Sequence, residues 1–263
     1  MLKRLTMMFV LFNLFFLALQ SLAVRAAELN RQAIEKLLSA ASRGKPADLR
    51  RKDLEGLDLS GLDLRNADLW GATLKRANLS DADLSGLNLD LTVMTGINLS
   101  GAQLTDVSIF GVFMGGANLV GADLRGSRII ATLDRANLSN SDLSGANWGV
   151  DIKNQPMGQM RVSLKNANLS GATLAGADLN RAMLQFADFT GANLENTILF
   201  RADLAGADFS NANLRGADLS QAKLDGANFS GADLKGTLLR EIEGKSNLRG
   251  LDQARNKNDA VFE

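Results

Sequence analysis

The sequence predicts an all-β solenoid, a tube made by winding short extended segments around a continuous apolar core. The first observation is a five-residue unit that recurs without a gap between Ala202 and Leu239: a small residue, a polar residue, Leu or Phe, and two turn-forming residues. The second is that a period of five matches neither a helix nor a strand. The third is that unusual residues at the central position of the unit recur every twenty residues.

The residue types of the unit explain how it would fold. In an extended segment, residues two apart share a face, so the small residue and the Leu point inward and the polar residue between them points outward. The Gly, Asn or Ser that follows favours a corner. Four units per coil would place like central residues on one another, which suits a packed core because volume mismatches are costly. The recurring central residues are Phe189, Phe209 and Phe229, Met94 and Met114, and Ile109 and Ile129.

Units such as A-D-L-S-Q and A-N-L-R-G resemble those of the pentapeptide-repeat family, and the resemblance extends from Ala47 to about Leu239. It implies a right-handed quadrilateral β-helix with four pentapeptides per coil, in which the central Leu and the small residue two before it face inward. We therefore expect a first solenoid part over residues 47–148 and a second part over residues 162–240. The absence of cysteine excludes a disulfide framework.

Residues 1–26 have the pattern of a secretory signal peptide. Two basic residues precede an apolar run over residues 5–19, and small residues follow at Val24 and Ala26, where a signal peptidase would cleave. The sequence thus predicts an exported protein, in the periplasm or an equivalent lumen. An uncleaved membrane anchor is the alternative, because the apolar segment is nearly long enough to span a bilayer.

Residues 27–46 are predicted to form an N-terminal capping segment with one amphipathic helix over residues 28–43. Asn30 is a suitable N-cap, and Gly44 and Pro46 end the pattern. The apolar side chains expected on one face are those of Ile34, Leu37, Leu38 and Ala41. Such a helix would cover the first coil, whose exposed edge otherwise invites aggregation. A partner-binding or membrane-surface helix is the alternative.

Two irregularities interrupt the repeat. The spacing of central residues falls to four between Ile129 and Leu133 and rises to sixteen between Trp148 and Leu164, so the two slips cancel. Residues 149–161 are therefore predicted to form a protruding loop or irregular insertion, either functional or harmless. After the repeat fades, residues 241–263 are expected to form a C-terminal cap or tail.

The composition argues against an enzyme. The chain contains no histidine, cysteine or tyrosine, so the usual nucleophiles and acid–base groups cannot be assembled. Outward aspartates such as Asp178 and Asp203 alternate with Asn and lack the G-G-x-G-x-D pattern of calcium-binding β-rolls, so we expect neither a metal nor a cofactor. The charges balance, with 29 basic and 29 acidic residues, which argues against a nucleic acid partner.

One group of apolar residues departs from the outward polar pattern. Trp70, Phe110 and Ile130 follow central residues at positions that are normally polar, and intervals of forty and twenty place them on one side of the tube. The neighbouring corner adds three more apolar residues: Leu91, Val93 and Phe113. We call these six residues the apolar strip. Exposed apolar patches usually mark contact sites, although residues 149–161 or a terminal segment could instead cover the strip.

These features predict a non-catalytic, exported repeat protein that acts as a rigid scaffold for protein interaction. Its partner is either an unidentified protein or a second copy of the chain. A membrane is a partner only if the N-terminal segment stays attached. Two other functions are considered: a membrane-anchored structural rod, and a cytoplasmic DNA mimic that binds a topoisomerase, an activity implied by resemblance to some family members.

Overall fold

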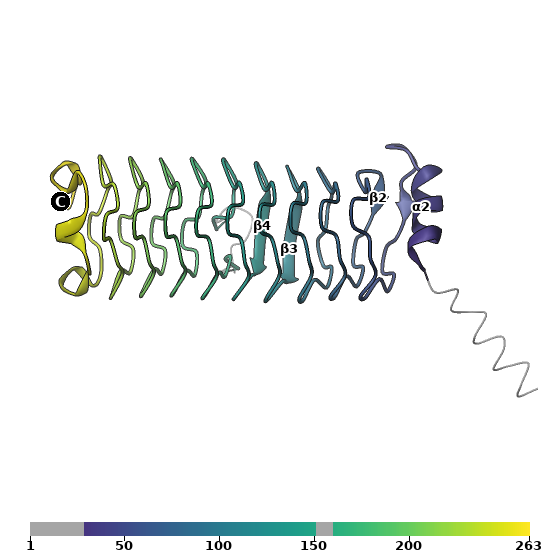
Figure 1. The fold of residues 1–263 in the computed structure, drawn as a ribbon, viewed down its shortest axis with the longest axis horizontal. Coiled ribbons are helices and arrows are strands. Elements are labelled where there is room, and N and C mark those ends of the chain that lie inside the picture. The colour runs from purple at the N-terminus through teal and green to yellow at the C-terminus, as the bar shows by residue number, and fades with distance from the viewer. Residues whose placement is uncertain (1–28, 151–159) are drawn as a thin grey trace, which may run out of the picture.

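In a computed structural model that describes residues 29–150 and 160–263, the chain forms a long stack of coils (Figure 1). Away from the two irregularities and the last coil, parallel bridges join residues twenty positions apart on every side of a coil. In the second half they link Asp203 to Lys223, Asp208 to Asn228, Asn213 to Asp233, and Asp218 to Leu238. Because four consecutive units supply the four bridges, one coil contains four five-residue units. The predicted solenoid is confirmed.

The strands are short because a corner follows every few residues. β1 (Ala47–Asp48) pairs with β2 (Ala67–Asp68), and β3 (Ser108–Phe113) pairs with β4 (Arg128–Thr132), both in parallel. Elsewhere the extended pieces form single bridges. The inward Ala and Leu side chains are buried and belong to one continuous core from Ile34 to Leu239. Each coil therefore depends on its neighbours for both backbone pairing and burial.

The expected stacking of like residues in the core is confirmed. The ring centroids of Phe189 and Phe209 lie 5.0 Å apart, and those of Phe209 and Phe229 lie 5.1 Å apart. Ile109 of β3 pairs in register with Ile129 of β4. Identical side chains on adjacent coils have matching volumes, which is favourable in a close-packed interior.

The outward Asp and Asn residues also hold the corners. The Oδ1 atom of Asp218 accepts a hydrogen bond from the backbone N–H of Ser220 at 2.9 Å, and the same contact recurs along the stack. This is the Asx turn that favours Asp and Asn in tight turns. On one side, amides also bond between coils: Asn98 Nδ2 donates to Asn78 Oδ1 at 2.8 Å. The outward Asp carboxylates therefore act as hydrogen-bond acceptors within the turns.

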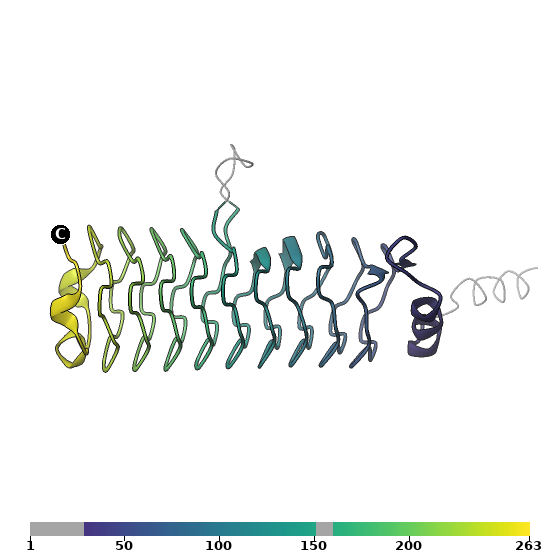
Figure 2. The same ribbon diagram turned by 90° about the horizontal axis from the view of Figure 1, so that it is seen from above.

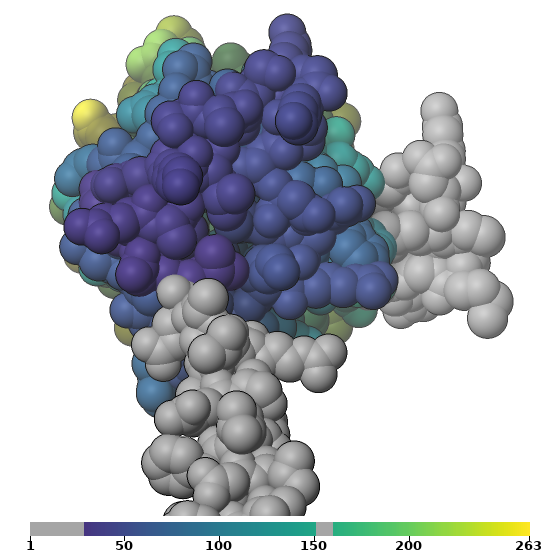
Figure 3. Space-filling model, turned by 90° about the vertical axis from the view of Figure 1, so that its right-hand side faces the viewer, coloured from purple at the N-terminus to yellow at the C-terminus, as the bar shows by residue number. Residues whose placement is uncertain are grey.

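Helix α2 (Arg31–Ser39) lies at the N-terminal end of the stack, where its residues spread over the first coil (Figures 1 and 3). Asn30 is its N-cap and accepts a hydrogen bond from the N–H of Ala33 at 2.9 Å. Ile34 is fully buried and belongs to the continuous core. The helix thus places one large apolar side chain on the end of the core.

Two details of the predicted helix are wrong. It ends at Ser39 rather than at residue 43, because Ser42 and Lys45 form an antiparallel pair that turns the chain into β1. Leu37 was expected on the buried face but is exposed. A nine-residue helix that crosses the end of a narrow tube contacts it along a narrower stripe than the sequence pattern suggests.

The predicted signal peptide lies outside the described residues. Within residues 29–150 and 160–263, no helix is both long and apolar enough to cross a membrane. The predicted insertion is described only at its ends, where the chain leaves and rejoins the stack on the edge that carries β3 and β4 (Figure 2). The repeat then resumes, since the N–H of Leu133 donates to the carbonyl of Ser163 at 2.7 Å.

The C-terminal residues form a further coil built from units of six residues instead of five. Its four bridging residues are Glu243, Arg249, Arg255 and Val261. Between them lie three 3₁₀ helices: η1 (Lys245–Asn247), η2 (Leu251–Gln253) and η3 (Lys257–Asp259). Each corner gains one residue and becomes a helical turn. The sequence contains the corresponding pattern, because partly buried Ile242, Leu248, Ala254 and Ala260 recur every six residues.

Replacing Gly250 with Ala is expected to lower the free energy of unfolding of the final coil by about 2–4 kcal/mol. Gly250 has a left-handed backbone (φ +66°), and a Cβ atom there would lie 2.6 Å from the backbone nitrogen of Ser230. Gly226→Ala is the matched control, because Gly226 has a similar φ of +68° but nothing lies within 4 Å of its Cβ position. Its cost should be about 1 kcal/mol, from backbone conformation alone. Equal thermal melting curves for the two variants would contradict the close approach of the last two coils.

Candidate protein-interaction ridge

One corner of the solenoid carries most of the outward apolar side chains that depart from the polar pattern of the repeat. Along it, backbone N–H groups donate to carbonyls of the next coil: Arg51 to Trp70, Gly71 to Asp90, Leu91 to Phe110, Arg181 to Phe200, Arg201 to Ser220, and Gln221 to Arg240. We call this corner, with the outward residues of the adjacent side, the ridge. It consists of residues 50–53, 70–73, 90–93, 110–113, 130–132, 160–163, 180–183, 200–203, 220–223 and 240–243.

The N-terminal half of the ridge carries the apolar strip, and its exposed centre differs from the one expected. Leu91 is 54% exposed and Phe113 is 69% exposed, and Val93, which pairs with Phe113, is also exposed. Trp70 and Phe110 are only half-exposed, and the guanidinium of Arg51 lies 5.0 Å from the centre of the Trp70 ring. The strip is therefore most accessible at Leu91, Val93 and Phe113.

The placement of Ile130 in the exposed strip is wrong, because its side chain is only 1% exposed. The cause is the residue missing between Ile129 and Leu133. Ile130 pairs with Phe110, but the next pair joins Ala131 to Val112, so β4 continues straight where β3 turns at Gly111. Without a corner, the side chain of Ile130 is packed inside the ridge. A deletion can thus bury an outward residue without changing the fold of neighbouring coils.

One end of the insertion contacts the apolar strip. Phe113, Ile130 and Met160 help to line a depression of about 310 Å³. A Cβ atom at Gly111 would lie 3.8 Å from Leu91 Cδ2 and 3.9 Å from Met160 Cε, so these side chains flank the same corner. Within the part of the chain that the structure describes, Met160 covers some of the strip and leaves its centre accessible.

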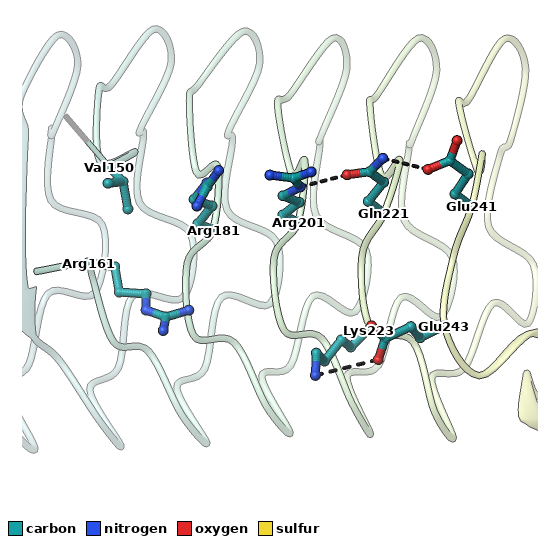
Figure 4. Close-up of a pocket in the computed structure, with 8 residues that line it drawn as sticks. All are labelled: Val150, Arg161, Arg181, Arg201, Gln221, Lys223, Glu241 and Glu243. Atoms are coloured by element: carbon teal, nitrogen blue, oxygen red, sulfur yellow. Dashed lines mark hydrogen bonds and ion pairs between the residues drawn. The ribbon is translucent and has the colours of Figure 1, made fainter. Parts of the chain in front are cut away.

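The C-terminal half of the ridge contains a second depression, of about 450 Å³, that sequence reasoning missed (Figure 4). Its polar lining consists of a row formed by Arg181, Arg201, Gln221 and Glu241, and of Arg161, Lys223 and Glu243 below that row (Figure 4). The pattern that could have revealed it is the twenty-residue spacing of the three arginines. We call this depression the charged groove. Arg161 lines both depressions, so the apolar strip and the charged groove are adjacent.

Hydrogen bonds order the charged groove. Arg201 Nε donates to Gln221 Oε1 at 2.6 Å, and Gln221 Nε2 donates to Glu241 Oε2 at 2.5 Å (Figure 4). Lys223 and Glu243 form an ion pair at 3.4 Å. The groove therefore has arginines toward its N-terminal end and two glutamates at its C-terminal end. Among residues 29–150 and 160–263, no group of three or more His, Cys, Asp or Glu side chains is arranged to hold a metal ion.

The fold and the repeat agree with one protein family. The family described as pentapeptide repeats matches the chain in eight copies, over residues 47–76, 58–96, 88–126, 160–199 and 202–240. These matches cover more than half of the sequence. The chain belongs to the pentapeptide-repeat family.

Solved structures of this family are similar to the chain. HetL, a pentapeptide repeat protein involved in heterocyst differentiation regulation from the cyanobacterium Nostoc sp. strain PCC 7120, is 31% identical; the match covers 89% of this chain and 95% of HetL, with a TM-score of 0.38. A pentapeptide repeat protein from the Arabidopsis thaliana thylakoid lumen is 27% identical over 53% of this chain and 88% of that protein, with a TM-score of 0.18. QnrB1, a plasmid-mediated fluoroquinolone resistance protein, is 19% identical over 76% and 90%, with a TM-score of 0.40. Among curated proteins, none matches the chain.

Proposed function

We propose that this protein is a non-catalytic, exported scaffold whose ridge binds another protein through the apolar strip. The observation that carries the proposal is the exposure of Leu91, Val93 and Phe113 on adjacent coils of a regular stack. Most outward positions of the repeat carry polar residues, so three neighbouring apolar side chains reduce solubility unless a partner covers them. Phe in particular suits the centre of a contact patch.

The regular backbone supports a scaffold role. Hydrogen bonds connect each coil to the next from Ala47 to Val261, and the core is continuous. A partner would therefore meet a preformed surface and lose little free energy in ordering it. The right-handed, four-sided winding implied by the family resemblance is part of this proposal. So is export, which is supported by the basic and apolar pattern of residues 1–26.

Photo-crosslinking from position 113 tests the proposed contact. A photoreactive phenylalanine analogue at position 113 is expected to give a discrete crosslinked product in cells that produce the full chain. The control is the same analogue at position 186, because Phe186 is 64% exposed on a different corner. The mass of the product distinguishes a second copy from a different protein. Cell fractionation of the same sample tests export.

A strip variant then tests which side chains bind. The strip variant combines three substitutions: Leu91→Asn, Val93→Thr and Phe113→Thr. Asn occupies left-handed corner positions such as Asn140 in this chain. In the column of Val93 and Phe113, Thr73 pairs with Val93 and Thr132 pairs with Phe113. Because position 113 is substituted in this variant, the photoreactive analogue is placed at position 110. The amount of crosslinked product should fall by about tenfold or more, as expected for loss of central apolar contacts. Phe186→Asn should leave it unchanged. Equal products from the two variants, or equal crosslinking at 113 and 186, would refute the contact.

A further inference from the structure

The charged groove contains a ladder of three arginines. Arg181 and Arg201 occupy the same left-handed corner in successive coils, with φ of 58° and 57°. Arg161 precedes them by one coil, because Ser163 pairs with Met183 and Met183 with Asp203. Adjacent parallel segments lie about 4.8 Å apart, so the ladder spans about 10 Å. Figure 4 shows Arg181 and Arg201 side by side above Arg161. Three like charges repel one another at this spacing unless anions lie between them.

Among the described residues, the first two arginines of the ladder have no carboxylate partner, in contrast to Arg65 and Arg125. Arg65 pairs with Asp63 at 2.7 Å and lowers the pKa of that carboxyl through a side-chain hydrogen bond. Arg125 does the same to Asp123, at 2.6 Å. Arg161 and Arg181 are half-buried, yet no carboxylate of the described residues lies within 4.0 Å of either guanidinium. A partly desolvated and unpaired guanidinium favours an external anion.

The third arginine is held in place for such a contact. The Nε of Arg201 donates a hydrogen bond to Gln221, whose amide nitrogen in turn donates to Glu241. The Arg201 guanidinium also lies 5.0 Å from the centre of the Phe200 ring. No described residue accepts a hydrogen bond from the two terminal nitrogens of Arg201, so these donors can face a ligand while Nε is held. A planar guanidinium held in this way binds a carboxylate at a low cost in side-chain entropy.

We propose that the charged groove binds the acidic side chains of an extended segment in the protein partner. This inference rests on the proposed function and specifies the chemistry of the partner. Arg161 connects the groove to the apolar strip, so one segment with apolar residues followed by acidic residues would contact both. Glu241 and Glu243 repel a long, uniformly charged polyanion at the far end of the groove.

Fluorescence anisotropy with a labelled hexaglutamate peptide and the full chain tests the groove. Arg181→Glu combined with Arg201→Glu is expected to weaken binding by about tenfold or more, because two charge-assisted contacts become repulsive. The matched control is Arg76→Glu combined with Arg135→Glu. Arg76 and Arg135 have the same left-handed corner conformation, with φ of 55° and 60° against 58° and 57°, but lie exposed on another corner. This control should bind within about twofold of the unaltered chain.

The outcomes separate this inference from the proposed function. Equal affinity in the two double variants would overturn it. Tighter binding of pyrophosphate, or of a single-stranded oligonucleotide, than of hexaglutamate would also overturn it, in favour of a free-anion or nucleic acid site. The strip variant retains all three arginines and should bind hexaglutamate normally. Failure of the position 113 crosslink with intact hexaglutamate binding would therefore refute the apolar contact alone, and the reverse would refute the groove alone.

Discussion

Replacing Leu204 with Asp is expected to lower the free energy of unfolding by at least about 5 kcal/mol. Leu204 is fully buried in a core cluster of hydrophobic side chains, which offer no hydrogen bond to a carboxylate. The variant loses the burial of a large apolar side chain and also places a charge in the core. Since each coil needs the next, coils on both sides should become unstable.

Asp203→Asn is the matched control for this variant. Asp203 points outward, where its carboxylate accepts hydrogen bonds from Gln185 Nε2 at 2.6 Å and from the N–H of Ala205. An Asn side chain can still accept from the N–H of Ala205 through Oδ1, and its Nδ2 can donate to Gln185 Oε1 once the Gln185 amide rotates, because that oxygen has no partner in the structure. Asn already occupies the corresponding position of the unit at residues 193 and 213. The expected change is within about 0.5 kcal/mol. Denaturant unfolding of both variants measures the difference, and similar midpoints would contradict the inward and outward assignment of the repeat.

Phe209→Ala is expected to lower the free energy of unfolding by about 3–5 kcal/mol. The Phe209 ring lies between Phe189 and Phe229, with nearly parallel planes on the Phe189 side at 4°. Truncation opens a cavity that the two flanking coils cannot fill, because their backbones are hydrogen-bonded in register. It also removes two aromatic stacking contacts at once.

Phe186→Ala controls for the loss of a phenyl ring as such. Phe186 lies at a corner, with its ring against Gly206, and is 64% exposed. Its truncation should change the free energy of unfolding by no more than about 0.5 kcal/mol. Thermal melting and near-ultraviolet circular dichroism can follow both variants. If Phe186→Ala proved as destabilising as Phe209→Ala, the aromatic column would not be a special part of the core.

Hydrogen exchange can locate the effect of both core substitutions. In a solenoid, stability is close to a sum of coil stabilities and contacts between neighbours. Amides of the coils next to residues 204 and 209 should therefore lose protection first, and those near α2 should change least. This regional pattern would distinguish a local core defect from a general loss of folding.

The sequence by itself determined the solenoid, the coil length and most of the core. The reason is that the five-residue unit specifies its own conformation: the small residue and Leu must be buried, and Gly or Asn must form the corner. The twenty-residue recurrence of Phe189, Phe209 and Phe229 then specified which coils stack, because a core selects for matching volumes. The prediction that the repeat resumes in its original register after the insertion is also confirmed, because the N–H of Leu133 donates to the carbonyl of Ser163.

Only the tertiary structure decided what lies on the ridge. Whether an outward side chain is exposed depends on the coil above and below it, so Ile130 is buried where β4 lacks a corner. The charged groove likewise depends on side chains from five coils and on the hydrogen bonds that orient them. The last coil changes to six residues per unit because its corners become 3₁₀ turns. Local pattern determines the coil, whereas contacts between coils determine the surface that a partner meets.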